Sequence, residues 1–184
     1  MMNEMEMNME SGFEFVKKGK LVSLRMITRQ DTELVVKWRN NPRVRDNFVY
    51  REFFTKEIHE KWLEDKVFAG EVVQMIIVEN DCQRPVGSVY LRYTTEDKTE
   101  AEYGIFIGED DAIGKGYGNE TARLAVEYAR EELGIKRLIL RAFCYNIAAI
   151  RSYEHAGFVK FQDMPAVLCS DGQKSDMILM ENCL

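Results

Sequence analysis

The stretch IGKGYGNE, residues 113–120, decides the fold of this 184-residue chain. A strand-like run, AEYGIFI at 101–107, precedes it, and a long helical pattern follows it. Its three glycines at alternate positions let the backbone adopt angles that side chains would forbid, and let it approach a ligand closely. The free N–H groups and the partial positive charge of a helix N-terminus attract anions. The sequence therefore predicts a phosphate or pyrophosphate site between a strand and a helix.

Two familiar phosphate loops do not fit the spacing of the glycines. A Walker loop has four residues between its first Gly and Gly-Lys, and a hydroxyl residue after the Lys. Here five residues separate Gly108 from Gly114-Lys115, and Gly116 stands in the hydroxyl position. A dinucleotide fingerprint needs a third glycine where Asn119 stands, so that match is weak. A glycine-rich turn without a ligand remains an alternative.

Upstream of the loop, the chain alternates apolar strands with short polar turns. Strands are predicted at 73–78 and 86–93, followed by the strand at 101–107. Because the connections are short, these three strands should form an antiparallel meander. An alternating segment at 21–27 predicts a further strand nearer the start of the chain.

Downstream of the loop, apolar residues recur at helical spacing and then form a continuous run. The helical positions are Ala122, Ala125, Val126, Ala129 and Leu133. Gly134 fits a left-handed helix cap, and residues 137–144 read as a buried strand. Strand, helix and strand in this order predict a parallel crossover unit whose helix starts at the glycine loop.

The remaining elements are predicted from caps and short apolar runs. Asp31 and Thr55 each fit the N-cap of a helix, and Asn146 fits the N-cap of a late one. Two final strands are expected near 159–162 and 177–180.

These elements predict a single α/β (α+β) domain over residues 20–184. Its central sheet should be mixed and largely antiparallel, with about seven strands flanked by about four helices. Residues 1–19 lie outside this domain and are predicted to be disordered, because their first part shows no apolar period.

Composition narrows the class of protein. The net charge of −6 argues against a nucleic-acid partner, which would require a basic surface. No apolar run is long enough to cross a membrane, and the first residues lack signal-peptide features, so we expect a cytoplasmic protein without a membrane partner. The four cysteines are widely spaced and the two histidines are isolated, so neither a disulfide framework nor a metal site is expected.

Four motifs occur in one characteristic order along the chain. They are WRNNP at 38–42 followed by a helix with Trp62, YGIFIG at 103–108, GKGYG at 114–118, and NIAAIRSYEHAGF at 146–158. With these motifs the chain resembles the GNAT superfamily of acetyl-CoA-dependent N-acetyltransferases, and most closely its RimJ/RimL-type branch. The resemblance covers about residues 20–182 and implies a GNAT-like fold. It also implies acetyl transfer from acetyl-CoA to a primary amine by direct attack in a ternary complex.

The resemblance implies where the cofactor binds. The pantetheine arm would pair with the strand at 105–107 like an added strand, and the pyrophosphate would lie on backbone N–H groups of the glycine loop. Asn146 would bind the arm, cap its helix, or both, and Arg151 would reach a CoA phosphate unless it only faces solvent. The predicted cofactor-binding residues are Ile105, Phe106, Ile107, Ile113, Gly114, Lys115, Gly116, Tyr117, Gly118, Asn119, Asn146 and Arg151. At Ile113 the superfamily often has Arg or Gln, a difference with little consequence for a loop that binds through its backbone.

Two residues are implied in catalysis. Tyr153 occupies the position of the family's general acid, which protonates the leaving thiolate, and its alternative is a core tyrosine. Glu102 lies on the strand that leads to the cofactor and would act as the base, directly or through water. Its alternative is a solvent-facing glutamate or one that pairs with a basic neighbour. Tyr103 points to the opposite face of the strand, so only one of the two adjacent residues can serve.

The acceptor pocket is expected between the first two helices, their loop and the final strands. Trp38, Arg39, Asn40 and Tyr50 are predicted to bind the acceptor, although aromatic residues here fit a core equally well. The acceptor is an amine of unknown identity: a protein N-terminus, an antibiotic, a polyamine or an amino sugar.

Three alternatives to this function remain. The Trp-Arg-Asn-x-Pro element also resembles acetyltransferases for nucleotide-linked amino sugars. A non-catalytic CoA-binding module would have the same fold, but retention of the candidate acid argues against it. A nucleotide enzyme of the Walker type is disfavoured by the glycine after Lys115. We expect either a monomer or a homodimer.

Overall fold

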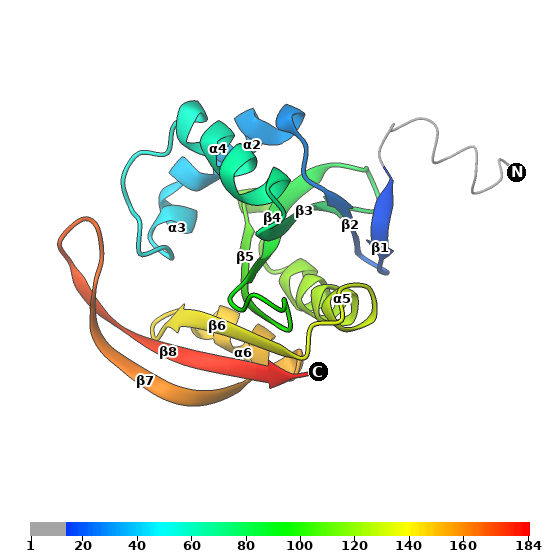
Figure 1. The fold of residues 1–184 in the computed structure, drawn as a ribbon. Coiled ribbons are helices and arrows are strands. Elements are labelled where there is room, and N and C mark those ends of the chain that lie inside the picture. Colours follow the sequence, from blue (N-terminus) through cyan, green and yellow to red (C-terminus); the bar gives the residue numbers. More distant parts are fainter. Residues whose placement is uncertain (1–13) are drawn as a thin grey trace, which may run out of the picture.

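Eight strands of the described residues, 14–184, form one sheet in the order β1-β2-β3-β4-β5-β6-β8-β7 in the computed structural model (Figure 1). The strands are β1 (Phe15–Lys18), β2 (Val22–Met26), β3 (Val72–Glu79), β4 (Pro85–Tyr93), β5 (Glu100–Ile107), β6 (Arg137–Phe143), β7 (Val159–Leu168) and β8 (Lys174–Cys183). Neighbouring strands are antiparallel except β5 and β6, which are parallel. The predicted mixed, largely antiparallel sheet and the crossover unit are therefore confirmed.

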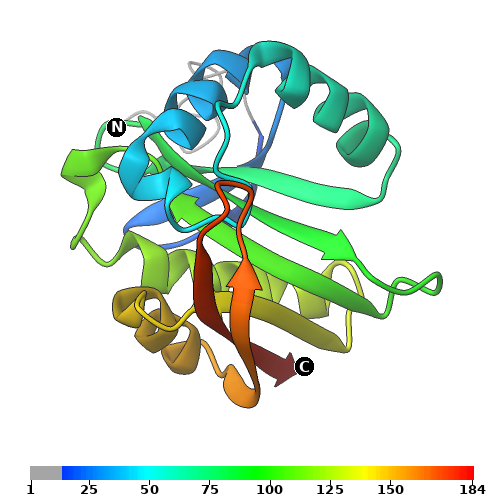
Figure 2. The same ribbon diagram turned by 90° about the vertical axis from the view of Figure 1, so that its left-hand side faces the viewer.

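Helices cover both faces of this sheet (Figures 1 and 2). Within the described residues they are α2 (Thr32–Asn40), α3 (Pro42–Arg45), α4 (Lys56–Trp62), α5 (Tyr117–Glu131) and α6 (Ile147–His155). Short 3₁₀ segments, η1 (Arg29–Asp31) and η3 (Asp110–Ala112), and a π-helical turn, η2 (Leu63–Phe68), complete the set. None of the helices in residues 14–184 is long and apolar enough to span a membrane.

The structure adds one strand and one short helix to the predicted set. The strand is β1, so the prediction of disorder over 1–19 is wrong for Phe15–Lys18, while residues 1–13 lie outside the described part of the chain. Antiparallel pairing with β2 orders this short segment, and Val16 packs against the core. The added helix is α3, whose N-cap Asn41 accepts a hydrogen bond from the backbone N–H of Arg43.

Two hydrophobic clusters lie on opposite faces of the sheet. Successive residues of β3 face opposite sides, as the strand period requires. Met75 and Ile77 belong to the large cluster beneath α5, whereas Ile76 and Val78 belong to a smaller cluster that contains Trp38 of α2. Because both faces of β3 are covered, its sequence is apolar except for the buried residues Gln74 and Glu79.

The sheet splits between β5 and β6. β4 pairs with β5 from Ala101 to Ile107, but β6 pairs with β5 only at residues 100–102. Beyond this point β6 continues along β8, and the two halves of the sheet diverge in Figure 1. Residues 103–107 of β5 are therefore left without a strand on their β6 side.

The last two strands are much longer than the predicted four-residue runs at 159–162 and 177–180. Each has 10 residues, and their hairpin rises in front of the sheet toward the loop after α3 (Figure 2). There the backbone N–H of Ser170 donates to the carbonyl of Val49, and the N–H of Arg51 donates to the Ser170 hydroxyl. The hairpin thus closes one side of the opening between the two halves of the sheet.

Candidate active site

The glycine loop forms the N-terminus of α5. Gly114 and Gly116 have φ angles of 77° and 82°, in the left-handed region that favours glycine, and Gly116 is the N-cap of the helix. In the described part of the chain, no acceptor is paired with the backbone N–H groups of residues 114–116. The next three N–H groups belong to the first turn, where an α-helix has no partner for them. A row of free N–H donors therefore stands at the positive end of a 15-residue helix, as a pyrophosphate would require.

The side chains of Tyr117 and Glu120 anchor the glycine loop to neighbouring segments. The Tyr117 side chain is buried, and its hydroxyl donates to Glu79 at 3.0 Å. The Glu120 carboxylate accepts the backbone N–H groups of residues 20–22 at 2.6 to 2.9 Å. Tyr117 can therefore contribute only its backbone to a cofactor. Lys115 is exposed, with its ammonium 5.8 Å from the Tyr117 ring.

The loop residues beside these anchors are open to solvent. Ile113 is exposed, as is Asn119 in the first turn of α5. Gly118 lies within the helix, so its role does not depend on unusual backbone angles. A methyl group built on Gly114 would meet no atom within 4 Å, which shows that the space around this part of the loop is open.

The predicted pantetheine strand is the unpaired part of β5. The side chains of Ile105 and Ile107 pack against the large cluster, and that of Phe106 points to the other face. The guanidinium of Arg43 donates to the carbonyl groups of Ile107 and Gly108 at 3.1 and 3.3 Å. Arg43 therefore occupies the carbonyl of Ile107, and no described strand pairs with residues 103–107 on the β6 side, where an amide-bearing ligand could pair with the remaining groups.

Tyr153 on α6 reaches β5 where the two strands begin to diverge. Its ring lies 5.9 Å from that of Tyr103 on β5 and 6.2 Å from that of Phe158, both edge-on. Burial, and to a smaller degree the neighbouring Tyr90, raises the pKa of Tyr153 above its ordinary value. The hydroxyl is therefore a proton donor throughout the neutral range. The two interpretations of Tyr153, a core residue and an acid, are both compatible with this position.

Asn146 is a helix cap in the structure. Its side-chain oxygen accepts the N–H of Ala149 at 3.4 Å, and its amide donates to Asn47 at 2.9 Å. The prediction of a cap is confirmed, and in the structure the amide group of Asn146 is bonded to Asn47. Arg151 lies exposed on α6.

Glu102 is held by two arginines. Its Oε1 accepts from Arg141 at 2.9 Å, and its Oε2 accepts from Arg92. The side chain is 9% exposed, whereas those of the two arginines are 43% and 42% exposed. The structure thus shows the alternative in which this glutamate pairs with basic neighbours.

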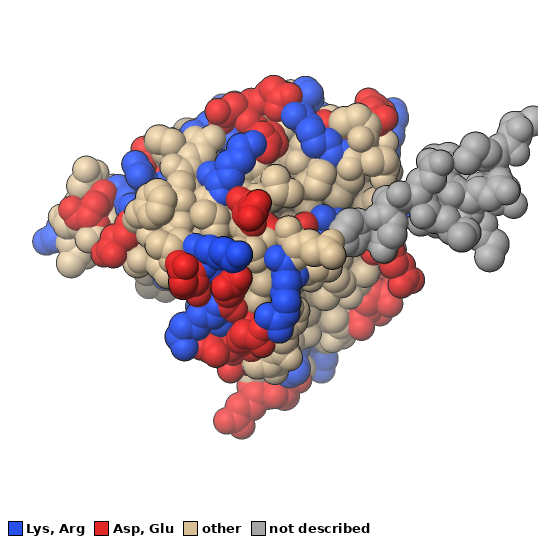
Figure 3. All heavy atoms as spheres, turned by 90° about the horizontal axis from the view of Figure 1, so that it is seen from above, with Lys and Arg blue, Asp and Glu red and all other residues tan. Residues whose placement is uncertain are grey.

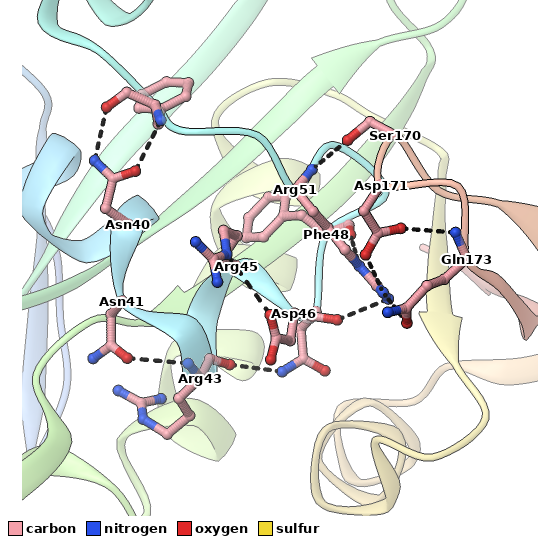
Figure 4. Close-up of polar contacts among 12 residues, drawn as sticks. Asn40, Asn41, Arg43, Arg45, Asp46, Phe48, Arg51, Ser170, Asp171 and Gln173 are labelled. Atoms are coloured by element: carbon pink, nitrogen blue, oxygen red, sulfur yellow. Dashed lines mark hydrogen bonds and ion pairs between the residues drawn. The ribbon is translucent and has the colours of Figure 1, made fainter.

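Four residues were predicted to bind the acceptor, and the structure gives them different environments. Trp38 is fully buried, its indole N–H donates to Glu109 at 2.7 Å, and its ring occupies the space beside Gly108. The prediction that Trp38 contacts the acceptor is corrected, because its side chain belongs to the core. Asn40 bonds to both backbone groups of Phe54 and so fastens the loop (Figure 4).

The other two predicted acceptor residues lie near each other. Arg39 is 9% exposed, and its guanidinium lies 3.3 Å from the centre of the Phe48 ring. Tyr50 is 40% exposed on the loop that follows α3. These two side chains remain candidates for acceptor binding.

A hollow of about 320 Å³ lies next to this region and was not predicted. Figure 4 shows its centre, where Arg51 bridges the loop after α3 and the β7–β8 hairpin through Asp171 at 3.2 Å and Gln173 at 3.3 Å. The hollow is lined by Asp46, Arg51, Tyr145, Asp171, Gln173 and Ser175. These residues come from three distant segments, and no local sequence signal links them.

Charge on the helical side of the molecule is mixed. Figure 3, which looks down on it from above, shows acidic and basic side chains interspersed with large uncharged areas. Within residues 14–184, no three His, Cys, Asp or Glu side chains are grouped as a metal site requires. The four cysteines are free thiols.

Comparison with known proteins agrees with this geometry. A family model described as an acetyltransferase (GNAT) domain matches residues 22–159. An uncharacterised protein of Methanocaldococcus jannaschii, MJ1062, is 31% identical over 144 residues, which cover 76% of this chain and 28% of that protein. The chain therefore spans little more than a quarter of the length of this curated relative.

Solved structures share the fold at low sequence identity. The spermidine N-acetyltransferase of Vibrio cholerae in complex with CoA and spermine has a TM-score of 0.81 at 19% identity, covering 90% of this chain and 96% of that one. A GNAT-family acetyltransferase from Bacillus anthracis has a TM-score of 0.78 at 16% identity, covering 92% and 98%. With the family model matching most of its length, the chain belongs to the GNAT acetyltransferases, the acyltransferases that use acetyl-CoA.

Proposed function

We propose that this protein transfers the acetyl group of acetyl-CoA to a primary amine by direct attack in a ternary complex. The observation that carries the proposal is the opening between β5 and β6. It brings together an unpaired strand edge, a candidate acid on α6 and, at the end of β5, a loop that leads to a glycine-lined helix N-terminus. These are the three parts that a CoA thioester needs: a partner for its amides, a site for its pyrophosphate and a proton for its sulfur.

The cofactor contacts divide between backbone and side chains. Backbone groups of 105–107 would pair with the pantetheine amides, and N–H groups of 113–119 would hold the pyrophosphate. Asn146 would add a side-chain contact to the arm after releasing Asn47, and Arg151 a contact to a phosphate. Most of the affinity would then come from the backbone, which explains why Ile113 can replace a polar residue.

Acetyl transfer from the thioester needs a hydrogen-bond donor for the developing oxyanion, a base for the amine and an acid for the leaving sulfur. A backbone N–H near Phe106 or Ile107 would donate to the developing oxyanion, an interaction worth about 3 kcal/mol. As the C–N bond forms and the C–S bond breaks, Tyr153 would give its proton to the sulfur. The burial that raises the pKa of Tyr153 would also raise that of a thiol beside it, so the two groups stay closer in acidity than solution values suggest.

We propose that Glu102 acts on the amine through water. Arg92 and Arg141 already occupy one position on each carboxylate oxygen, and each oxygen retains further acceptor capacity for a water. The Glu102 carboxylate would orient that water, which would take the proton of the attacking amine and pass it to bulk solvent, so that both ion pairs stay intact.

A thermal-shift titration with acetyl-CoA, CoA and ATP–magnesium tests the cofactor assignment. A ligand at a hundred times its dissociation constant stabilises the fold by about 2.7 kcal/mol. Both CoA species should raise Tm, and ATP–magnesium should not. An absence of any shift with either CoA species would remove the cofactor site and the residues assigned to it.

An amine panel, followed by release of free CoA thiol, then tests turnover. Turnover with any primary amine supports the enzyme, and CoA binding without turnover across protein N-terminal peptides, polyamines, amino acids and amino sugars would favour a non-catalytic module.

We also propose that the chain belongs to the RimJ/RimL-type branch, on the basis of its WRNNP and late-helix motifs. We propose a cytoplasmic location, which its free cysteines support.

A further inference from the structure

Arg39 is a buried cation with aromatic neighbours but no carboxylate partner among residues 14–184. Its side chain is 9% exposed, its Nη1 has no hydrogen-bond acceptor among residues 14–184, and no described carboxylate pairs with it. Its planar guanidinium lies over the Phe48 ring at 3.3 Å from the ring centre and 5.1 Å from that of Phe54. Burial lowers the pKa of Arg39 to about 10, which still leaves it charged at neutral pH. Aromatic contacts offset only part of the cost of burying such a charge.

A second buried arginine shows what the fold normally supplies. Arg25 is 4% exposed, and its guanidinium donates two parallel hydrogen bonds to Asp31 at 2.9 and 2.7 Å. This fork-to-fork pair satisfies both charges. Arg39 is 9% exposed, and none of the carboxylates in residues 14–184 forms such a pair with it. Of these two buried guanidinium groups, only that of Arg25 is therefore matched by a carboxylate of the described residues.

The guanidinium of Arg39 lies close to the predicted reaction centre. The Phe48 ring beneath it is 5.9 Å from the ring of Phe106 on β5, edge-on. Tyr90, opposite Gly104 in the sheet, fills the surface on the same face, because a side chain at Gly104 would meet the Tyr90 ring at 2.3 Å. An anion on Arg39 would therefore lie one aromatic ring away from the strand that holds the thioester.

Positive charges outnumber negative ones around Tyr90 in a protein whose net charge is −6. The charges that act on Tyr90 are those of Glu102, Arg92, Arg141 and Arg39, and among the described residues both Arg92 and Arg141 pair with Glu102. Three guanidinium groups against one carboxylate would repel a polycation such as spermidine and attract an anionic group.

We propose that Arg39 binds an anionic group, a carboxylate or a phosphate, on the amine acceptor, so that the substrate is an amine with an oxyanion at its other end rather than a polyamine. This inference rests on the proposed acetyl transfer and names its substrate class. The guanidinium fork, fixed in plane by Phe48, can donate two parallel hydrogen bonds to an oxyanion, and this orients the amine toward β5.

The test uses acceptors that differ only in the charge of the end opposite the amine. The carboxylate compound is γ-aminobutyrate, its neutral counterpart is the amide, its cationic counterpart is putrescine, and aminoethyl phosphate represents phosphates. Each compound is measured as a chain-length series at constant ionic strength. We expect kcat/KM for the anionic acceptors to exceed that for the amide by about tenfold or more, and putrescine to be the poorest. The anionic series with the higher kcat/KM shows whether the acceptor carries a carboxylate or a phosphate. Preference for putrescine would overturn the inference and leave the proposed acetyl transfer intact.

The Arg39→Met variant separates binding from folding. Loss of a buried charge that no carboxylate of residues 14–184 offsets should leave Tm unchanged or raise it. The ratio of kcat/KM for the anionic acceptor to kcat/KM for the amide should fall to about one. Arg29→Met is the control, because Arg29 is an exposed arginine paired with Glu64 on the other side of α2, and its preference should equal that of the wild type. If Arg39→Met fails to fold, Arg39→Lys keeps the charge without the fork, and undiminished anion preference in it would contradict bidentate binding.

A thermal-shift measurement of acceptor binding gives a result that does not depend on turnover. In the presence of CoA, γ-aminobutyrate or aminoethyl phosphate should raise Tm of the wild type more than that of Arg39→Met, and the amide should raise neither. This outcome would support the inference even if no amine were acetylated and the proposed function failed. Equal shifts in both proteins, or none, would overturn it.

Discussion

The two sides of the opening between β5 and β6 are built by different means. On the cofactor side, the groups that would bind are backbone N–H and C=O groups of β5 and of the turn into α5. On the acceptor side, they are side chains from α2, the loop after α3 and the β7–β8 hairpin, held together by Asn40, Arg51 and Ser170 (Figure 4). The first side needs only the right backbone angles, whereas the second depends on contacts between distant segments.

The cofactor side should therefore tolerate side-chain substitutions that would change the acceptor side. The pyrophosphate loop tolerates Ile113 because donors on the backbone survive substitution of side chains. A single change at Arg39 or Arg51 would instead alter the charge that an acceptor meets. Each of the following experiments changes one residue at or near this opening.

Tyr153→Phe acts at the junction of the two sides. Removal of one hydroxyl deletes the proposed proton donor to the sulfur, and general acid catalysis is worth about a hundred- to ten-thousandfold. We expect kcat to fall by a factor in this range while CoA binding stays unchanged, measured by thiol release and by thermal shift. Turnover that persists at the wild-type rate across the pH range would remove Tyr153 from its role.

Acid should weaken the acceptor side through His59. This histidine of α4 is 1% exposed, its Nδ1 lies 3.1 Å from the Thr32 hydroxyl of α2, and burial lowers its pKa to about 4. The unfolded chain therefore binds the proton first, near pH 6.5. The stabilisation is complete above that pH and is lost as pH falls toward 4, by about 3 kcal/mol in all.

Urea unfolding between pH 7 and 4 measures this loss. His59→Gln cannot take up the proton and should show a flatter dependence over the same window, whatever its stability at pH 7. His155→Gln, which changes the exposed histidine on α6, is the matched control and should keep the wild-type dependence. If the slopes of His59→Gln and His155→Gln are the same, His59 is not the group responsible.

Glu102→Gln distinguishes a base from a structural ion pair. If Glu102 relays the amine proton through water, the variant should lose about tenfold or more in kcat/KM near neutral pH, and the deficit should shrink as rising pH deprotonates the amine in solution. Circular dichroism and Tm report on the broken ion pairs with Arg92 and Arg141. A deficit that is constant across the pH range would assign Glu102 to positioning alone.

The smallest effect is expected from Gly114→Ala. Its φ of 77° lies in the left-handed region, so an alanine should cost about 1 kcal/mol of stability and weaken CoA binding several-fold by shifting the loop. Gly134→Ala carries the same type of strain, at φ 66° and equally without neighbours, at the other end of α5. It should lose similar stability with unchanged CoA binding. Equal CoA affinity in both variants would mean that the loop geometry does not hold the pyrophosphate.

The elements around the glycine loop were predictable from contiguous residues. The helix after 113–120 and the strand at 137–144 follow from local backbone preferences and a 3.6-residue period, and both are confirmed. Gly134 has the predicted left-handed φ, although the helix itself ends at Glu131. Asn146 as a cap follows from a side chain that bonds to its own helix. The added β1 was missed because four residues carry too weak a signal on their own.

The acceptor side shows where such prediction ends. Trp38 reads equally well as a pocket residue or a core residue, and its burial against Gly108 decided between them. The partners of Glu102 lie 10 and 39 residues away, on strands whose register had to be known before a pair could be named.

The sequence alone therefore specified the fold family, the loop, the helix N-terminus and the position of Tyr153, because each depends on the geometry of a short continuous segment. Packing decided the burial of Trp38, the ion pairs of Glu102, the hollow around Arg51 and the position of Arg39 away from any carboxylate of residues 14–184 that could pair with it. These features arise where segments far apart in the chain meet. Since the energy of a buried charge depends on every neighbour that packing brings to it, the character of the acceptor site could be read only from the folded chain.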